Sequence, residues 1–506
     1  MCGIFANISD KYQDISKLKK LGNKCNHRGP DSTKEIYFHN NNNYVYFLFH
    51  RLAINGLNVK SDQPLQMNNY TLICNGEIYN YKELADKYNY KLNTDSDCEI
   101  ILHLYSNKKI NNFINELDGV FSFILFDSSI NKIIIGHDPF GIRPLYYCHT
   151  DDYKNMFFSS EMKCINEFNN IKFYPPGSYS VYDLNNFKFT ITPYYNFIYK
   201  PLNLLEPEII KNIKSLLINS VKKRLITDRP FGCLLSGGLD SSIITSIICN
   251  IFGSSNIRTF SIGLKDSPDL IAAEKVSKAL GTNHTSVVVT EKEMLEAIEP
   301  TIYQIESKDI TTVRASVPMF LLSKYIQKNT DIKVIFSGEG SDEASGSYLY
   351  FHNAPDPKTF QEECIRLLKD VHMFDVLRSD KTTAGAGLEI RVPFFDKKFI
   401  EFYMGIDPSL KMIKNGHEKY LLRKSFEKDL PKEIIWRRKD GFSDGVSSNK
   451  KPWYKIIHEY SINNYNINED QLYLKIFNKY YKNIIPYNWM PKWTNQNNPS
   501  GRLIIN

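Results

Sequence analysis

The sequence contains no long hydrophobic run. None of its apolar stretches approaches the roughly 20 residues that a membrane-spanning helix requires. The first residues also lack a basic segment followed by an apolar one, which a secretory signal peptide would need. These absences predict a protein that neither crosses a membrane nor carries a signal peptide, and we therefore expect a cytoplasmic location.

CxxC pairs of cysteines and long blocks of positive charge are also absent. The nine cysteines include no CxxC pair, so their spacing indicates neither a disulfide framework nor a zinc site. The 63 basic side chains exceed the 56 acidic ones by only 7, and no long run of Lys and Arg concentrates them. This mild excess does not indicate a nucleic-acid partner.

The residue pattern of the 506-residue chain changes near residue 200. Before that point, short aromatic and β-branched runs such as YTLICNGEIY and VFSFILFD are separated by turn residues. One helical pattern, DCEIILHLY, lies among them. The pattern predicts an α+β domain with substantial antiparallel sheet over residues 1–200.

After residue 200 the pattern is that of alternating strands and helices. Pro201 and Pro207 flank an expected linker, and apolar residues at helical spacing predict a helix over residues 208–225. The short apolar runs FGCLL, RTFSIG, HTSVVV and KVIFSG then alternate with helical segments. This alternation predicts an α/β domain, a parallel sheet with flanking helices, over residues 201–506.

The stretch FGCLLSGGLDSS joins an expected strand to an expected helix. Glycines allow a sharp turn, hydroxyls add hydrogen-bond donors, and a helix N-terminus supplies positive potential. SGG alone would fit a plain turn, but with Asp240 inside it the segment predicts a phosphate site with a metal ion. The Walker pattern GxxxxGK[ST] and the dinucleotide pattern GxGxxG are both absent.

With these motifs the sequence resembles the glutamine-hydrolysing asparagine synthetases of the eukaryotic type. The loop resembles the pyrophosphate loop of N-type ATP pyrophosphatases, and the first residues resemble N-terminal-nucleophile (Ntn) glutaminases. The resemblance extends over essentially the whole chain, in order. The motifs that carry it are MCGI, NHRGPD, NGEIYN, DPFGIRPLYY, SGGLDSS, DSPDL, DITTVRASVPM, FSGEGSDE, GLEIRVPF and KDGFSDG.

For the N-terminal domain, the resemblance implies layered antiparallel sheets and a glutaminase site. Cys2 is the implied nucleophile once Met1 has been removed, and its free α-amine could then accept the thiol proton. The implied donors to the oxyanion are the Asn75 side chain and the Gly76 backbone N–H. NG is also a strong hairpin signal, and both readings can hold.

The resemblance also implies how glutamine is held. Arg51 would bind the α-carboxylate, for which a guanidinium is suited. Glu77 and Asp97 would bind the ammonium and neighbouring groups, and Asn75 also belongs to this site. Taken alone, Arg51 or Asp97 would more often be a solvated surface charge, and it is their occurrence together with the other motifs that favours a site.

For the C-terminal domain, the resemblance implies that ATP activates aspartate as β-aspartyl-AMP, which ammonia then converts to asparagine. Glu339 would be the general base, and Arg314 and Lys439 would face the phosphates. Asp240 and Asp342 would bind Mg²⁺. The residues implied to bind ATP are Leu234, Ser236, Gly237, Gly238, Asp240, Ser241, Ser242, Ile262, Ser337, Gly338 and Gly340.

Other functions of the same scaffold are weighed against this one. A β-lactam synthetase-like enzyme would amidate or cyclise another carboxylate, but such relatives typically lack a working N-terminal cysteine site. Amidophosphoribosyltransferases share a similar start yet lack SGGLDSS, and a catalytically inactive storage or regulatory protein would have lost site residues. The sequence departs from many relatives at Ser347 and Asp440. The expected partners are glutamine, aspartate, ATP and a second copy of the chain.

The first prediction concerns the start of the mature chain. Since the Cys2 nitrogen becomes a basic amine only when Met1 is gone, intact-mass analysis of the purified protein is expected to show a chain that lacks Met1. Retention of Met1 would imply a silent glutaminase.

Overall fold

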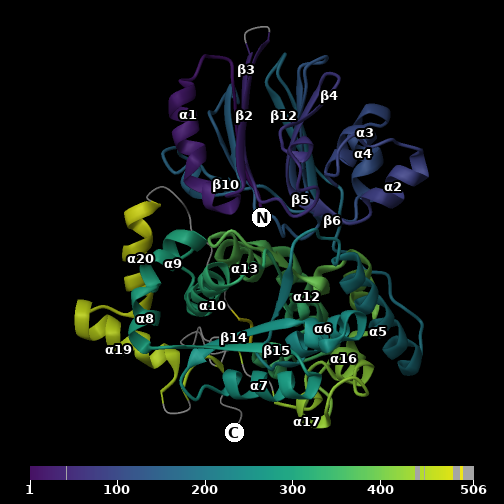
Figure 1. The fold of residues 1–506 in the computed structure, drawn as a ribbon, viewed down its shortest axis with the longest axis vertical. Helices are drawn as coiled ribbons and strands as arrows, with labels where there is room; N and C mark the ends of the chain where they lie inside the picture. Colours follow the sequence, from purple (N-terminus) through teal and green to yellow (C-terminus); the bar gives the residue numbers. More distant parts are fainter. Residues whose placement is uncertain (41–42, 439–440, 442–444, 449–450, 482–490, 494–506) are drawn as a thin grey trace.

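The first half of the chain forms two six-stranded antiparallel sheets, which lie at the top of Figure 1. The structure is a computed structural model that describes residues 1–40, 43–438, 441, 445–448, 451–481 and 491–493. The first sheet contains, in order, β10 (Lys172–Phe173), β8 (Tyr146–His149), β9 (Asn155–Ser159), β1 (Gly3–Ser9), β3 (Asn43–Arg51) and β2 (Ser32–Asn40). The second contains β12 (Lys188–Pro193), β11 (Ser178–Asp183), β7 (Lys132–His137), β6 (Gly119–Asp127), β5 (Tyr70–Ile78) and β4 (Leu65–Met67).

Period-two alternation places these sheets face to face. Ile4 and Ala6 of β1 pack into one apolar core with Ile73 of β5 and Ile124 of β6, because alternate side chains point to the same face of a strand. Helices cover the outer faces, as Figure 1 shows. They are α1 (Ile15–Gly22) on one side, and α2 (Tyr81–Tyr88), α3 (Glu99–Asn107) and α4 (Ile110–Phe113) on the other. The predicted antiparallel, layered α+β domain is confirmed.

The second half is built on a parallel sheet with the order β15 (Asn283–Val289), β14 (Arg258–Leu264), β13 (Phe231–Leu234), β16 (Val334–Phe336) and β17 (Glu389–Arg391). The predicted α/β fold is therefore confirmed as well. Its helices are α5 (Glu206–Lys223), α6 (Leu239–Phe252), α7 (Pro268–Leu280), α8 (Glu291–Glu296), α9 (Ile298–Ile305), α10 (Ile310–Asn329), α11 (Ser341–Ser345), α12 (Pro357–Asp370), α13 (Asp375–Ala384), α14 (Lys397–Gly405), α15 (Pro408–Lys411), α16 (Tyr420–Ser425), α17 (Lys432–Ile435), α19 (Trp453–Tyr465) and α20 (Glu469–Tyr480).

Helix α5 begins earlier than predicted. The sequence predicted a helix from residue 208 with Pro207 in the linker, whereas the helix begins at Glu206 and Pro207 lies in its first turn. The first turn tolerates proline because its N–H groups have no partner within the helix. No helix in the described part of the chain is long and apolar enough to cross a membrane.

Buried ion pairs join the two halves. Arg28 of the first half donates to Asp380 of α13 at 2.7 Å and to Glu161 at 3.1 Å, and all three side chains are at most 1% exposed. Arg143 lies 3.5 Å from the other carboxylate oxygen of Asp380 and 3.7 Å from Glu389. Figure 1 shows α13 at the junction, next to the N-terminus of the chain.

We predict that Asp380→Ala weakens this junction. Both arginines would keep one anion but lose the carboxylate between them, and breaking a buried ion pair costs about 3–5 kcal/mol. Urea unfolding followed by circular dichroism measures the loss. The control is Glu274→Ala, which removes an exposed pair with Lys278 on α7 and should leave unfolding unchanged. Equal behaviour of the two variants would contradict the structural importance of the junction.

Candidate functional site

The order of strands in the parallel sheet determines where a ligand can bind. From β13 the chain continues to β14 and β15 on one side and then returns to β16 on the other. In open parallel sheets, ligands bind outside the carboxyl ends of the strands where the strand order reverses. Here that point lies between β13 and β16. A cavity of about 280 Å³ is lined by the loops that follow these two strands.

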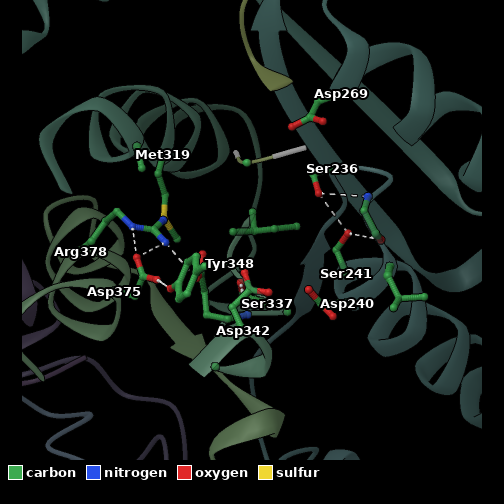
Figure 2. Close-up of a pocket in the computed structure, with 18 of the residues that line it drawn as sticks. Ser236, Asp240, Ser241, Asp269, Met319, Ser337, Asp342, Tyr348, Asp375 and Arg378 are labelled. Atoms are coloured by element: carbon green, nitrogen blue, oxygen red, sulfur yellow. Dashed lines mark hydrogen bonds and ion pairs between the residues drawn. The ribbon is translucent and has the colours of Figure 1, made fainter. Parts of the chain in front are cut away.

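The loop after β13 forms one wall of this cavity. Gly238 is the N-cap residue of α6, and its N–H donates to Ser236 Oγ at 3.3 Å. Ser236 Oγ lies 3.2 Å from Ser241 Oγ, as Figure 2 shows. Since the first N–H groups of a helix have no partner within it, this wall offers backbone and hydroxyl donors together. The arrangement is typical of a phosphate site.

The loop after β16 approaches the first loop closely. A Cβ atom on Gly338 would lie 2.7 Å from the backbone nitrogen of Ser241 and 2.9 Å from Cβ of Asp240. Any residue other than glycine would push the two loops apart. Gly338 therefore allows both loops to line one cavity.

Most residues predicted to bind ATP line the cavity, and two do not. The carbonyl of Gly237 accepts a hydrogen bond from Arg437 at 3.0 Å, and Ser242 Oγ donates to the Gly238 carbonyl at 2.7 Å. Both residues therefore support the loop. The lining residues of the predicted set are Leu234, Ser236, Gly238, Asp240, Ser241, Ile262, Ser337, Gly338 and Gly340.

The two predicted metal ligands, Asp240 and Asp342, line the same cavity and are both paired with Lys419. Lys419 Nζ is 2.5 Å from Asp240 Oδ2 and 2.5 Å from Asp342 Oδ1. Ser347 Oγ also donates to Asp342 Oδ1, at 2.5 Å, so this residue, at which the sequence departs from relatives, directly contacts a predicted metal ligand.

The residues present fit a magnesium ion that arrives with a nucleotide. Asp240 Oδ1 is buried and has no hydrogen-bond partner, so this oxygen is available to bind a cation. In the described part of the chain, no group of three or more His, Cys, Asp or Glu side chains could hold a metal by itself. Mg²⁺ is usually held by one or two carboxylates together with substrate phosphates, which is what this site offers.

Glu339, the predicted base, lines the cavity opposite the phosphate loop. Arg378 Nη2 lies 2.9 Å from Glu339 Oε2 and 2.9 Å from Asp375 Oδ1, and Tyr348 donates to Asp375 at 2.5 Å. Figure 2 shows Arg378, Asp375 and Tyr348 on one side of the cavity and Ser236 and Ser241 on the other. Burial raises the pKa of Glu339 to about 7, against the opposing effect of Arg378.

Arg314, one of the two basic residues predicted at the phosphates, lies elsewhere in the structure. Arg314 is not among the residues that line the cavity. It forms a two-pronged ion pair with Glu469 of α20, with Nε 2.8 Å from Oε1 and Nη2 2.5 Å from Oε2. Lys439, like Asp440, lies outside the described residues.

The predicted nucleophile lies at the junction of the two halves. Cys2 Sγ is 3.7 Å from the Leu52 carbonyl oxygen, and Arg28 Nε donates to the Cys2 carbonyl at 2.8 Å. With Met1 in place, burial raises the pKa of the Cys2 thiol to about 11. The thiol is therefore protonated at neutral pH, and Glu77 and Glu389 raise its pKa further.

Asn75 and Gly76 lie next to each other on β5. Both polar atoms of the Asn75 side chain are buried without a hydrogen-bond partner. Leaving such groups unpaired costs free energy, so their presence indicates a site that a polar ligand completes. A Cβ atom on Gly76 would lie 2.3 Å from the Val120 carbonyl oxygen, and the close pairing of β5 with β6 therefore requires glycine here.

Glu77 and Asp97 are two buried carboxyls in the same half of the chain. Burial raises the pKa of Glu77 well above its usual value, and Glu389 raises it further. Burial also raises the pKa of Asp97 to about 6, although the Ile78 N–H donates to its carboxylate at 2.6 Å. Two buried carboxyls with raised pKa values favour a cationic ligand group.

Arg51 is buried and already has partners. Its Nη1 lies 2.5 Å from Asp62 Oδ1 and 3.0 Å from the Asn58 carbonyl oxygen, and its Nη2 is 3.1 Å from the carbonyl oxygen of Asn55. Asn55 in turn donates to Glu77 at 2.5 Å. Arg51 therefore braces the loop beside Glu77, and its predicted contact with a substrate carboxylate stays a prediction.

Sequence reasoning missed several residues of the cavity wall. They are Asp269, Asp375, Arg378, Tyr348, Lys419 and Arg437. Lys419 lies in GHEKYLLRKSF, whose many charges are typical of an exposed helix end. Arg378 and Asp375 form an i,i+3 pair, which occurs on any helix surface. Only the fold brings these side chains to the switch point.

Comparison with known proteins gives matches over nearly the whole chain. The family model described as "Asparagine synthase" matches residues 212–359 and 354–481, and the model described as "Glutamine amidotransferase domain" matches residues 1–218. Two curated relatives are named "Asparagine synthetase [glutamine-hydrolyzing]". The one from Bos taurus is 40% identical and the one from Homo sapiens 41%, each over 100% of this chain and 98% of the relative.

A solved structure titled as the allosteric regulatory enzyme of purine biosynthesis is also similar. It is 13% identical, covers 57% of this chain and 90% of its own, and has a TM-score of 0.35. Similarity at this level carries no argument about the present chain.

We predict that Glu339 titrates near neutral pH. In protein labelled with ¹³C at glutamate side-chain carboxyls, one NMR signal absent from Glu339→Gln should have its midpoint near pH 7, whereas exposed glutamates titrate at about pH 4–5. Arg378→Met should move that midpoint upward, because the guanidinium favours the ionised carboxylate. A midpoint near 4 in the unmodified protein would contradict the burial of this carboxyl.

Proposed function

Because this chain belongs to the glutamine-hydrolysing asparagine synthetase family, we propose that it makes asparagine from aspartate, with glutamine as nitrogen donor and ATP as the activating substrate. One observation carries the proposal: a single chain holds both the unpartnered Asn75 amide in its first half and the cavity at the β13/β16 switch point in its second. Residues 1–200 would release ammonia and residues 201–506 would use it. Its location would be cytoplasmic, and its assembly a homodimer.

In the glutaminase half, Cys2 would attack the glutamine side-chain amide. Removal of Met1 turns the Cys2 nitrogen from an amide into an amine, which can take the proton of a thiol that is otherwise protonated at neutral pH. Asn75 Nδ2 and the Gly76 N–H would donate to the oxyanion that forms. The ammonium of glutamine would balance Glu77 and Asp97, whose raised pKa values favour a cation nearby.

In the synthetase half, the aspartate carboxylate would attack the α-phosphorus of ATP and displace pyrophosphate. The donors of Ser236, Gly238 and Ser241 would hold the pyrophosphate. A magnesium ion held by Asp240 and Asp342 would neutralise phosphate charge when bound. Predicted contacts of Arg314 and Lys439 with the phosphates remain part of the proposal, although Arg314 is bound by Glu469 in this structure.

Ammonia would then attack the β-aspartyl-AMP carbonyl and displace AMP. Glu339, with a pKa near 7, could take a proton from the attacking nitrogen at neutral pH. Ammonia would pass between the sites inside the protein, since in water it is largely protonated and lost as a nucleophile.

The products test this proposal. Incubation of the protein with glutamine, aspartate, ATP and Mg²⁺ should give asparagine, glutamate, AMP and pyrophosphate, separated by chromatography. Formation of ADP would contradict the adenylate mechanism, and absence of asparagine would contradict the substrate.

We predict that Cys2→Ala separates the two half-reactions. The variant lacks the thiol, so asparagine formation from glutamine should be lost, while formation from ammonium salts should be retained near the unmodified rate. Both rates are measured as pyrophosphate release. The matched control, Cys148→Ala, removes a buried thiol of β8 away from the site and should retain both activities. Loss of the ammonia-driven reaction in Cys2→Ala alone would contradict the assigned roles.

A further inference from the structure

Lys419 occupies the place between the two carboxylates. Its side chain is 2% exposed, and its Nζ contacts Asp240 and Asp342 at the same distance of 2.5 Å. The carboxylates come from different loops, one after β13 and one after β16, whereas Lys419 comes from the start of α16. The Lys419 ammonium therefore links three separate elements beside the predicted phosphate site.

The chain around Lys419 holds it in this position. Its backbone is left-handed, with φ 58° and ψ 31°, which non-glycine residues rarely adopt. Arg423 secures this turn. Its Nε donates to the Glu418 carbonyl at 2.8 Å, and its backbone N–H donates to the Lys419 carbonyl at 2.9 Å. A strained residue that its surroundings maintain is typical of a functional site.

Both carboxylates contact the Lys419 ammonium, and Asp240 Oδ1 is buried with no hydrogen-bond partner. Bringing these carboxylates together is costly unless cations neutralise them, so the empty protein needs Lys419 here. A divalent cation would balance both carboxylates at once and would leave the ammonium free for another anion.

We propose that Lys419 is an exchangeable counter-ion. Its ammonium neutralises Asp240 and Asp342 while the site is empty, and it moves to the phosphate oxygens of the nucleotide when a divalent cation binds between the carboxylates. This inference rests on the proposed function, because it takes the ligand to be a nucleotide with a divalent cation. Lys419 thereby makes cation binding depend on nucleotide binding, since the phosphates offer the displaced ammonium a new partner.

Manganese binding to the full-length protein tests the exchange. Free Mn²⁺ is counted by electron paramagnetic resonance during titration with MnCl₂, with and without α,β-methylene ATP, a non-cleavable analogue. In the unmodified protein, Mn²⁺ should bind weakly alone and about tenfold or more tightly with the analogue. In Lys419→Met, which keeps the apolar stem, Mn²⁺ alone should bind about tenfold more tightly than in the unmodified protein.

Matched variants separate the exchange from other effects. Lys424→Met removes a half-buried lysine of the same helix, paired with Glu427, and should not change Mn²⁺ binding. Asp240→Asn added to Lys419→Met should abolish the gained affinity. Lys419→Gln serves as a second neutral variant, and thermal unfolding identifies any variant that does not fold. In Lys419→Met the analogue itself should bind more weakly at saturating Mn²⁺.

Two results would overturn the inference. One is unchanged or weaker Mn²⁺ binding in folded Lys419→Met or Lys419→Gln. The other, which needs no variant, is Mn²⁺ binding to the unmodified protein that is equally tight with and without the analogue. Both are independent of the product assay: an unchanged Mn²⁺ affinity with normal asparagine formation refutes the exchange alone, whereas absence of asparagine refutes the proposed function.

Discussion

The two halves of the molecule meet at Asp380, a buried carboxylate of the second half that is paired with two arginines of the first. A charge removed from water needs compensating charges and hydrogen bonds, and these come from Arg28 and Arg143 across the junction. The same arginines reach Glu161 and Glu389, so the network closes only when both halves are in contact. These ion pairs therefore constrain how the two halves contact each other.

This network also fixes the surroundings of both sites. Arg391 lies 2.9 Å from Glu389 and 3.5 Å from Glu77, which places a predicted glutamine-binding residue at one end of the network. At the other end, α13 carries Asp380 and also Arg378, whose guanidinium contacts Glu339 at the cavity. One helix therefore contributes to the junction and to the cavity wall, and the two sites share a rigid support.

The sequence predicted the fold well because both halves have regular hydrophobic patterns. Alternation in β1 and β5 and the short apolar strands β13 and β16 depend on local residue order, which a sequence displays directly. Most of the cavity residues that were predicted lie at or near the carboxyl ends of strands, in the motifs that carry the family resemblance. Lys419 and Arg378 could not be found this way, since each enters the cavity from a helix and a charged residue on a helix is normally exposed.

Arg314 shows the opposite case: its motif assigns it to the cavity, and the fold places it elsewhere. Its motif placed it at the phosphates, but α20 lies against α10 and brings Glu469 within reach of its guanidinium. Two hydrogen bonds from a planar guanidinium to a carboxylate are strong in a buried setting. Glu469 lies 155 residues further along the chain, and no local sequence pattern predicts the contact.

At the start of the chain, burial shifts the pKa values of an amine and a thiol in opposite directions. The Met1 side chain is 1% exposed, and its terminal ammonium contacts the Leu388 carbonyl at 3.3 Å. Burial lowers the pKa of this ammonium to about 6, while it raises that of the neighbouring thiol to about 11. Burial therefore favours the uncharged form of both groups. On removal of Met1 the α-amine would lie on Cys2 itself, and the same effect of burial would favour the form of the amine that can accept the proton of the thiol.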